Sequence, residues 1–317
     1  MRFPFLDQGR AGNNNSTSTV GAMAFTWGGF FVVGGFPFLA LLAYVAFTNP
    51  EAAEAYFENP EANDALPISN LAMFVIVMLQ FPIALIGVWA GTKYLLQRSM
   101  KSLITSARKF RWGRMLAGLA LWAVLMGCYA FILYLRHPGT ITYAPDWERF
   151  FIFLPIALIL VPIQCSFEEI AVRGQLMQIT HARTRFRPLA TLLFTSFLFA
   201  MLHSLNPEVQ EYGWLTMMAQ YFAIGLVLGL FAILDGGLEL SIGMHTANNL
   251  FSFLLLSYPG SVLETPSVFQ QEHIEPWQDF LAILGMGFVL FVILYGRRPH
   301  VLQGLISKRD LGEDKSI

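Results

Sequence analysis

The sequence predicts an all-α fold: a polytopic bundle of about eight transmembrane helices with both termini in the cytoplasm. Composition, eight long apolar stretches and the placement of basic residues between them lead to this prediction. The chain has 317 residues, of which 55% are hydrophobic and only 13% are charged, and its mean hydropathy is +0.54. A soluble domain has about 25% charged residues. The composition therefore indicates that lipid surrounds much of the chain.

Each of the eight apolar stretches comes near the ~20 residues that a helix needs to cross the bilayer core. The first is too long for the apolar core of a signal peptide, and no small-residue cleavage site follows it, so we expect a retained helix. The fourth is expected to continue as a helix to about Thr180. The stretches are residues 23–47, 71–92, 115–135, 150–167, 189–205, 214–234, 240–257 and 280–295.

The basic residues predict how the helices are oriented. Seventeen of the 20 Lys and Arg residues fall in the two terminal segments and in the loops at 93–114 and 183–187. The opposite loops hold only Arg136 and Arg149, and they include an acidic loop at 51–64. Short basic loops stay in the cytoplasm. We therefore expect eight spans with both ends inside, in a multi-pass protein of the bacterial inner membrane, embedded in the lipid bilayer.

Three charged residues remain inside the spans, all of them at the end of the fourth. They are Glu168, Glu169 and Arg173, in the segment SFEEIAVRGQ. Ionisable groups at membrane depth are costly, and they usually mark a functional site. The alternative is a charged turn where the helix leaves the bilayer. Glu169 and Arg173 are four residues apart, a spacing that predicts an ion pair on one helix face.

Two further spans carry polar groups at helical spacing. Phe199 and His203 are four residues apart in the fifth span, and so are His245 and Asn249 in the seventh. This spacing places the members of each pair on one helix face. A lone histidine in a membrane helix is most often a hydrogen-bonding partner between helices. A carboxylate, two imidazoles and an amide from three spans together supply the groups that activate water and stabilise an oxyanion.

These residues form an ordered set of three motifs. E-E-x-x-x-R occupies residues 168–173, F-x-x-x-H residues 199–203 and H-x-x-x-N residues 245–249. The set resembles the CPBP family of membrane endopeptidases, which joins the type II CAAX prenyl endopeptidases to bacterial proteins linked to bacteriocin processing and self-immunity. The resemblance covers residues 150–257, the expected catalytic core. Residues 1–149 would form a three-span region before it, and residues 258–317 the last span and a cytoplasmic tail, in one integral membrane unit.

The resemblance implies an intramembrane endopeptidase that acts on a peptide or protein at the membrane. It implies that Glu168 is the catalytic carboxylate and that His203 helps to activate water. His245 and Asn249 would stabilise the substrate carbonyl or its oxyanion, and Phe199 would support the site. We expect the site to open towards the cytoplasmic half. The substrate would be a prenylated C-terminal peptide in a host with prenylation, or a leader peptide or membrane-protein tail in a bacterium.

The sequence leaves the participation of a metal open. One glutamate and two histidines form a known catalytic zinc set, so Glu168, His203 and His245 would be the ligands of a Zn2+ ion. No H-E-x-x-H motif occurs in the chain. A carboxylate, an imidazole and an amide can also hydrolyse a peptide bond without a metal. We therefore expect that no cofactor is required.

Two non-proteolytic interpretations remain. Intramembrane Glu, His and Arg also build proton relays in transporters, although a transporter predicts repeated halves and no internal repeat is visible. A membrane scaffold would use the same polar cluster to hold a partner protein. Other intramembrane proteases fit poorly, because Ser196 and Ser241 lack a G-x-S setting and Asp235 has no aspartate partner. The net charge of −1 argues against nucleic acid as a partner.

Overall fold

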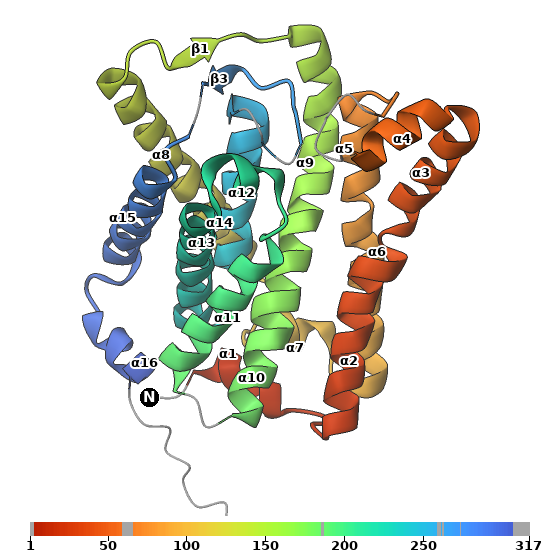
Figure 1. The fold of residues 1–317 in the computed structure, drawn as a ribbon. Helices are drawn as coiled ribbons and strands as arrows, with labels where there is room; N and C mark the ends of the chain where they lie inside the picture. Colours follow the sequence, from red (N-terminus) through yellow and green to blue (C-terminus); the bar gives the residue numbers. More distant parts are fainter. Residues whose placement is uncertain are drawn as a thin grey trace, which may run out of the picture.

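The computed structural model describes residues 3–58, 66–184, 187–258, 261, 263–272 and 274–306. Apart from three short strands, these residues form helices and connecting loops, so the fold is all-α as predicted (Figure 1). Part of the acidic loop at 51–64 and the end of the C-terminal tail, which is predicted to be cytoplasmic, lie outside the described residues.

Among the described residues, six helices are long and apolar enough to cross a membrane. They correspond to the first, second, third, fourth, sixth and eighth predicted stretches. They are Ser16–Thr48 with α2 (Ser16–Gly28) and α3 (Phe36–Thr48), Asn70–Leu95 with α5 (Asn70–Met78) and α6 (Gln80–Ala90), Trp112–Arg136 (α8), Trp147–Arg183 with α9 (Trp147–Glu169) and α10 (Gln178–Arg183), Trp214–Asp235 (α13) and Pro276–Tyr295 (α15). π-helical segments interrupt two of these helices, at Gly29–Val33 and Ile170–Met177, and the π-helical segment Gly91–Leu95 ends the helix that begins at Asn70.

The fifth and seventh predicted stretches form shorter helices. Helix α11 (Pro188–Leu202) has 15 residues, so the predicted end at residue 205 is wrong. Helix α14 (Glu239–Leu250) has 12 residues and continues as a π-helical turn, Phe251–Leu255. Neither reaches the ~20 residues that cross a bilayer core, and irregular backbone at that depth is tolerated only where protein surrounds it or where it lines a cavity. The described part of the chain has six long helices, and a total of eight spans stays a prediction.

Short elements complete the described fold. The strands form one sheet of order β1-β3-β2, in which β3 is antiparallel to β1 and parallel to β2. This sheet joins the segment after α8 to the segment between α14 and α15. The short elements are α1 (Pro4–Asp7), α4 (Pro50–Glu58), α7 (Met100–Ile104), α12 (Pro207–Tyr212), α16 (Gln303–Ile306), the 3-10 turns Gln8–Arg10 and Pro299–Leu302, β1 (Ile141–Tyr143), β2 (Leu256–Ser257) and β3 (Phe269–Gln271).

The two ends of the bundle differ in structure (Figure 1), and their loops differ in charge. The end that contains α1, α7, α10 and α16 is here called the basic end, and the opposite end, with the strands and α4, the sheet end. Arginines connect the loops of the basic end: Arg111 forms an ion pair with Glu239 (2.6 Å), and Arg183 donates to the backbone carbonyl of Asn14 (2.5 Å). Because α1 and α16 lie at the same end, an even number of crossings is supported. Which end faces the cytoplasm stays a prediction.

Glycine allows α14 to lie close to α8. A Cβ atom on Gly243 would collide with the backbone carbonyl of Met115, and one on Gly118 with that of Leu240. Small residues permit this close approach between membrane helices. Helix α14 also contacts α9 and α13, and all of its residues from 239 to 247 are buried. His245 is therefore held inside the bundle.

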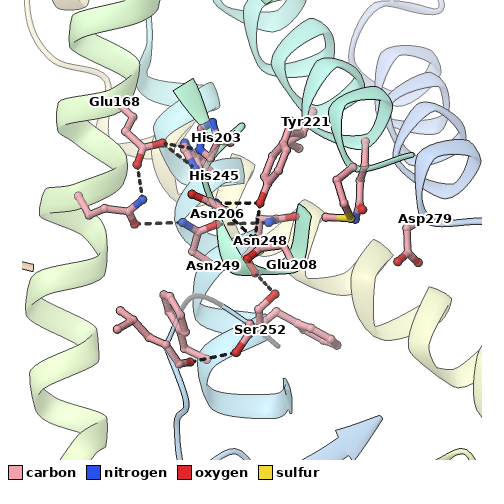
Figure 2. A pocket seen from close by; sticks show the side chains of 18 of the residues that line it. Glu168, His203, Asn206, Glu208, Tyr221, His245, Asn248, Asn249, Ser252 and Asp279 are labelled. Carbon is pink, nitrogen blue, oxygen red and sulfur yellow. Dashed lines mark hydrogen bonds and ion pairs between the residues drawn. The ribbon is translucent and has the colours of Figure 1, made fainter. Parts of the chain in front are cut away.

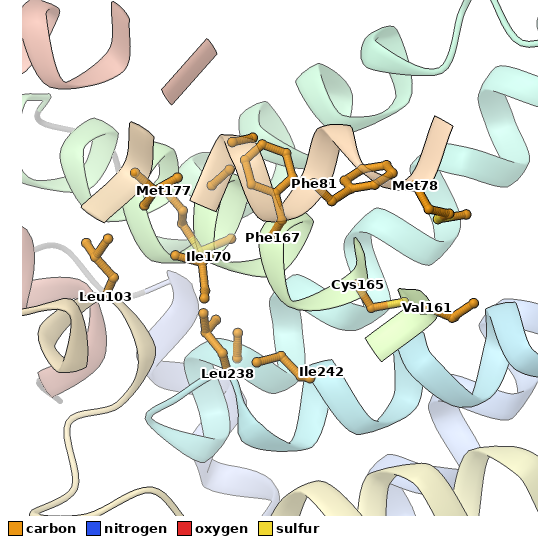
Figure 3. Packing of buried hydrophobic residues seen from close by; sticks show 14 of the residues in the cluster. Met78, Phe81, Leu103, Val161, Cys165, Phe167, Ile170, Met177, Leu238 and Ile242 are labelled. Carbon is orange, nitrogen blue, oxygen red and sulfur yellow. The ribbon is translucent and has the colours of Figure 1, made fainter. Parts of the chain in front are cut away.

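The largest apolar cluster surrounds α9 (Figure 3). It includes Phe81 of α6, Phe167 of α9 and Ile242 of α14. The ring centroids of Phe81 and Phe167 are 5.8 Å apart. Dense packing of this kind leaves a side chain few alternative positions. The cluster thus fixes the rotation of α9 about its axis next to Glu168.

Candidate active site

Glu168 and Glu169 end helix α9 and point in different directions. The π-helical segment Ile170–Met177 follows them directly, and such segments are frequent at functional sites. The Glu168 side chain is 15% exposed and lines the central pocket, whereas Glu169 is fully buried. Adjacent residues are about 100° apart around a helix. One glutamate therefore reaches the pocket while the other reaches α14.

His203 and His245 both approach the carboxylate of Glu168 (Figure 2). The Nε2 atom of His203 lies 4.0 Å from Glu168 Oε2, and that of His245 lies 3.7 Å from the same oxygen. His203 follows the last residue of α11, and His245 lies in the middle of α14. Residues from three separate segments of the chain thus meet at one carboxylate oxygen.

The hydrogen bonds of the two histidine rings place a proton on each Nδ1 atom. Nδ1 of His203 is 2.8 Å from the backbone carbonyl oxygen of Phe199, and Nδ1 of His245 is 2.9 Å from Glu169 Oε1. A carbonyl oxygen and an ionised carboxylate only accept, so each Nδ1 donates. In the neutral ring, Nε2 then carries a lone pair. Both lone pairs lie on the side of Glu168.

The oxygen at the centre of this arrangement has an unused hydrogen-bonding capacity. Glu168 Oε1 accepts from Gln164 Nε2 at 2.5 Å. Glu168 Oε2 is buried and accepts no hydrogen bond from the described residues. Buried polar atoms are normally hydrogen-bonded. The three facing acceptors are therefore suited to a small molecule that donates hydrogen bonds, such as water.

Glu169 and Arg173 form a buried ion pair at the predicted four-residue spacing. Arg173 Nη1 donates to Glu169 Oε1 at 3.0 Å, and its Nη2 donates to the backbone carbonyl of Gly225 at 3.3 Å. The guanidinium carbon also lies 4.2 Å from the ring centroid of Phe199. Because Glu169 Oε1 also accepts from His245, the ion pair is coupled to the orientation of that histidine.

Asn249 reaches the site through a glutamine that sequence reasoning missed. Gln164 Oε1 accepts from Asn249 Nδ2 at 3.0 Å while Gln164 Nε2 donates to Glu168. Gln164 therefore connects the carboxylate to the amide. Its place one helical turn before Glu168 is a signal that could have identified it. Asn248 accepts from Trp122 Nε1 at 3.3 Å, so it is a hydrogen-bonding residue of the packed helices.

A second polar group behind His203 was also missed. The His203 ring is stacked on Tyr221 of α13, with centroids 4.5 Å apart and an interplanar angle of 26°. The Tyr221 hydroxyl donates to Glu208 of α12 and accepts from Asn206 Nδ2 at 2.9 Å. No motif or spacing connects these residues in the sequence. Only the turn after α11 brings them to the histidine.

These residues line a pocket with a volume of about 420 Å³. Its walls reach from the centre of the bundle to the sheet end, where Tyr129 of α8, Tyr258 after β2 and Asp279 at the start of α15 contribute. Because the pocket extends away from the basic end, a basic end in the cytoplasm and a site that opens towards the cytoplasmic half cannot both be correct. Each of the two stays a prediction.

The predicted zinc ligands do not form a metal site as they are placed. Across the described parts of the chain, no three His, Cys, Asp or Glu side chains form a group arranged to hold a metal ion. Glu168, His203 and His245 offer the right kinds of donor for zinc. The participation of a metal therefore stays a prediction, and the reaction proposed below uses the side chains alone.

Comparison with known proteins agrees with the three motifs. Residues 147–251 match the profile of the type II CAAX prenyl endopeptidase Rce1-like proteins. The chain is also 31% identical over 258 residues to the uncharacterized protein YyaK of Bacillus subtilis (strain 168), an alignment that covers 80% of this chain and 84% of the relative. No solved structure matches the chain. From the motifs, the profile and this relative, we conclude that the chain belongs to the Rce1-like type II CAAX prenyl endopeptidase (CPBP) family.

Proposed function

We propose that this protein is an intramembrane endopeptidase that hydrolyses a peptide bond of a membrane-associated substrate with activated water. The observation that carries the proposal is the buried, unpartnered Oε2 atom of Glu168, which faces the Nε2 atoms of His203 and His245 at 4.0 and 3.7 Å. A general base must lie within hydrogen-bond reach of the water that it deprotonates, directly or after small movements on substrate binding. Glu168 meets this condition for a water held between it and a histidine.

In the proposed reaction, the water oxygen attacks the scissile carbonyl carbon while Glu168 takes one water proton. His203 accepts a hydrogen bond from the same water at Nε2, because its Nδ1 already donates to Phe199. The tetrahedral intermediate then collapses as the C–N bond breaks, and Glu168 returns the proton to the leaving amine. The products are a new carboxyl terminus and a new amino terminus, and the base is regenerated.

His245 and Asn249 are the proposed donors to the oxyanion. Asn249 Nδ2 uses one hydrogen for Gln164 Oε1 and has a second available. In the neutral ring, His245 donates at Nδ1 and accepts at Nε2. Donation from Nε2 to the oxyanion therefore requires the imidazolium form of His245, held between the carboxylates of Glu168 and Glu169. Donors fixed in place before the reaction stabilise a developing charge without reorganisation. The hydrogen bonds of Gln164 and Glu169 supply this fixation.

The position of the pocket supports a route for the substrate. The pocket extends to the sheet end, and the proposed orientation places the basic end in the cytoplasm of a bacterial cell. We therefore propose that the substrate reaches Glu168 from the side of the membrane opposite the cytoplasm. A leader peptide or the tail of a membrane protein would suit this route, and the relative in a bacterium is in keeping with it.

The test compares cells that contain the wild-type protein, Glu168→Gln, His203→Ala, Asn249→Ala or the control Glu148→Gln by proteomics of protein termini. Glu148 is an exposed glutamate at the other end of the same helix, so its variant should cleave like wild type. Glu168→Gln and His203→Ala should be near background, because the water is no longer activated. Asn249→Ala should be slower by ~100- to 1000-fold, the usual loss for one oxyanion donor.

The decisive result concerns Glu168. A folded, membrane-inserted Glu168→Gln protein that cleaves the same termini at more than about a tenth of the wild-type rate contradicts the mechanism, since loss of a general base typically lowers the rate by ~100-fold or more. Cleavage products that are the same with and without the protein would instead favour a transporter or scaffold.

A further inference from the structure

A buried carboxylate in the pocket wall has no role in the proposed reaction. Glu208 of α12 is only 3% exposed. Its Oε1 atom accepts from the Tyr221 hydroxyl and from Asn206 Nδ2. Its Oε2 atom is buried and has no hydrogen-bond partner among the described residues. Because Glu208 lines the pocket, this oxygen is placed to interact with a molecule that enters it.

The charged residues of the pocket wall are predominantly acidic. Glu168, Glu208 and Asp279 all line it, and among the described lining residues there is no Lys or Arg. Asp279 accepts from the Tyr129 hydroxyl at 2.6 Å, a neutral donor that leaves its charge unpaired. Figure 2 shows Glu208 between the catalytic group and Asp279. An anionic group, such as a free C-terminal carboxylate, would be repelled here.

The pKa of a tyrosine at the sheet end is affected by the additional carboxylates of the pocket. Burial raises the pKa of Tyr258, and the charges of Glu208, Asp279 and, least strongly, Glu211 raise it further. A negative charge raises the pKa of a phenol because it disfavours the phenolate. Tyr258 also lines the pocket. The negative region therefore extends from Glu208 towards the sheet end, along the proposed route of the substrate.

We infer that Glu208 forms a subsite for a cationic side chain, Lys or Arg, close to the scissile bond of the substrate. This inference rests on the proposed function, because it assigns a substrate class to the same pocket. Its position is on the His203 side of Glu168, since Tyr221 contacts both His203 and Glu208. Substrates would then be cut at a bond next to a basic residue, and not beside a free C-terminal carboxylate.

A purely structural role for Glu208 makes a different prediction. In that case the carboxylate would only hold Tyr221 against His203, and its loss would lower the turnover of every substrate equally. A subsite changes the preference between substrates instead. Sites built to pair a charged group discriminate against the uncharged analogue, because a buried partner is then left unpaired. The ratio of two substrates therefore separates the two roles.

The experiment uses the purified full chain in detergent and quenched fluorescent peptides with one apolar segment. Each peptide carries Lys, norleucine or Glu at one position within five residues of the cleaved bond. For the wild type, at one of these positions, kcat/KM for the Lys peptide should exceed kcat/KM for the norleucine peptide by about 10- to 100-fold. This is the value of a hydrogen bond to a charged group. Glu208→Gln should reduce this ratio to near 1. Glu148→Gln changes an exposed glutamate at the start of α9 that does not line the pocket, and it should keep the wild-type ratio.

Two further variants keep the outcomes distinct. Tyr221→Phe removes the link to His203 but keeps the carboxylate, so it should preserve a Lys preference. The dissociation constants of the same peptides for the Glu168→Gln variant measure binding without turnover. The Lys peptide should again bind more tightly than the norleucine peptide. This difference should disappear in the double variant Glu168→Gln, Glu208→Gln. Equal rates and equal affinities for Lys and norleucine peptides overturn the subsite, even where Glu168→Gln is inactive. A Lys preference in binding with no cleavage by the wild type would support the subsite and contradict the endopeptidase.

Discussion

The buried pair of Glu169 and Arg173 leads to a specific prediction about stability. The two side chains are 0% and 1% exposed, and Glu169 Oε1 lies 3.0 Å from Arg173 Nη1 and 2.9 Å from His245 Nδ1. Removal of one partner leaves the other charge buried without compensation, at a cost of ~3–5 kcal/mol. Both Glu169→Gln and Arg173→Met should therefore be strongly destabilised.

The double variant should behave differently from either single variant. With both charges removed, no uncompensated charge remains, and the losses are reduced to a few neutral hydrogen bonds of about 1 kcal/mol each. We expect the double variant to lie within about 2 kcal/mol of wild type, instead of the ~6–10 kcal/mol that independent losses would give. Activity should not return with stability, because His245 no longer has a carboxylate beside Nδ1.

The measurement is the free energy of unfolding in detergent from chemical denaturation, with cleavage of one peptide followed in parallel. If a single variant is too unstable to purify, recovery of the folded yield in the double variant replaces the free energy. A double variant that loses as much stability as the sum of the two single variants would refute the pairing. So would an Arg173→Met protein that unfolds like wild type.

Three more predictions concern the topology, the participation of a metal and the role of Gln164. Alkaline phosphatase fused after Pro60, in the acidic loop, should be active and fused after Arg108 should be silent, because short basic loops stay in the cytoplasm; the reverse pattern contradicts the proposed orientation. The purified protein should keep its activity in strong chelator. Stoichiometric zinc in the wild type that is lost in His203→Ala would instead show that this site binds a zinc ion. Gln164→Leu should lower kcat/KM by about 10- to 100-fold, because it loses the hydrogen bonds to Glu168 and Asn249. An unchanged kcat/KM would show that Gln164 and its link to Asn249 have no role in the reaction.

The helices and the motif residues were predictable because both depend on local regularities. Long apolar stretches must form helices in lipid, since every backbone polar group needs a partner inside the chain. The i,i+4 spacing of Glu169 with Arg173 follows from one helical turn, and the structure has this ion pair. The helix that begins at Trp147 runs to Arg183, past the expected Thr180. Composition and periodicity contain this information without any knowledge of neighbouring helices.

The site itself depends on contacts between segments that are distant in the chain. Helix α11 ends at Leu202 and not at residue 205, and this end places His203 against Tyr221 and near Glu208. Close packing at Gly243 sets the distance of α14 from α8 and encloses His245. Helical periodicity states which residues share a face, but not which face meets which, because that choice is made by the fit of side chains between helices. For the same reason, only the tertiary structure decided that the pocket extends to the sheet end and that Glu208 lies in its wall.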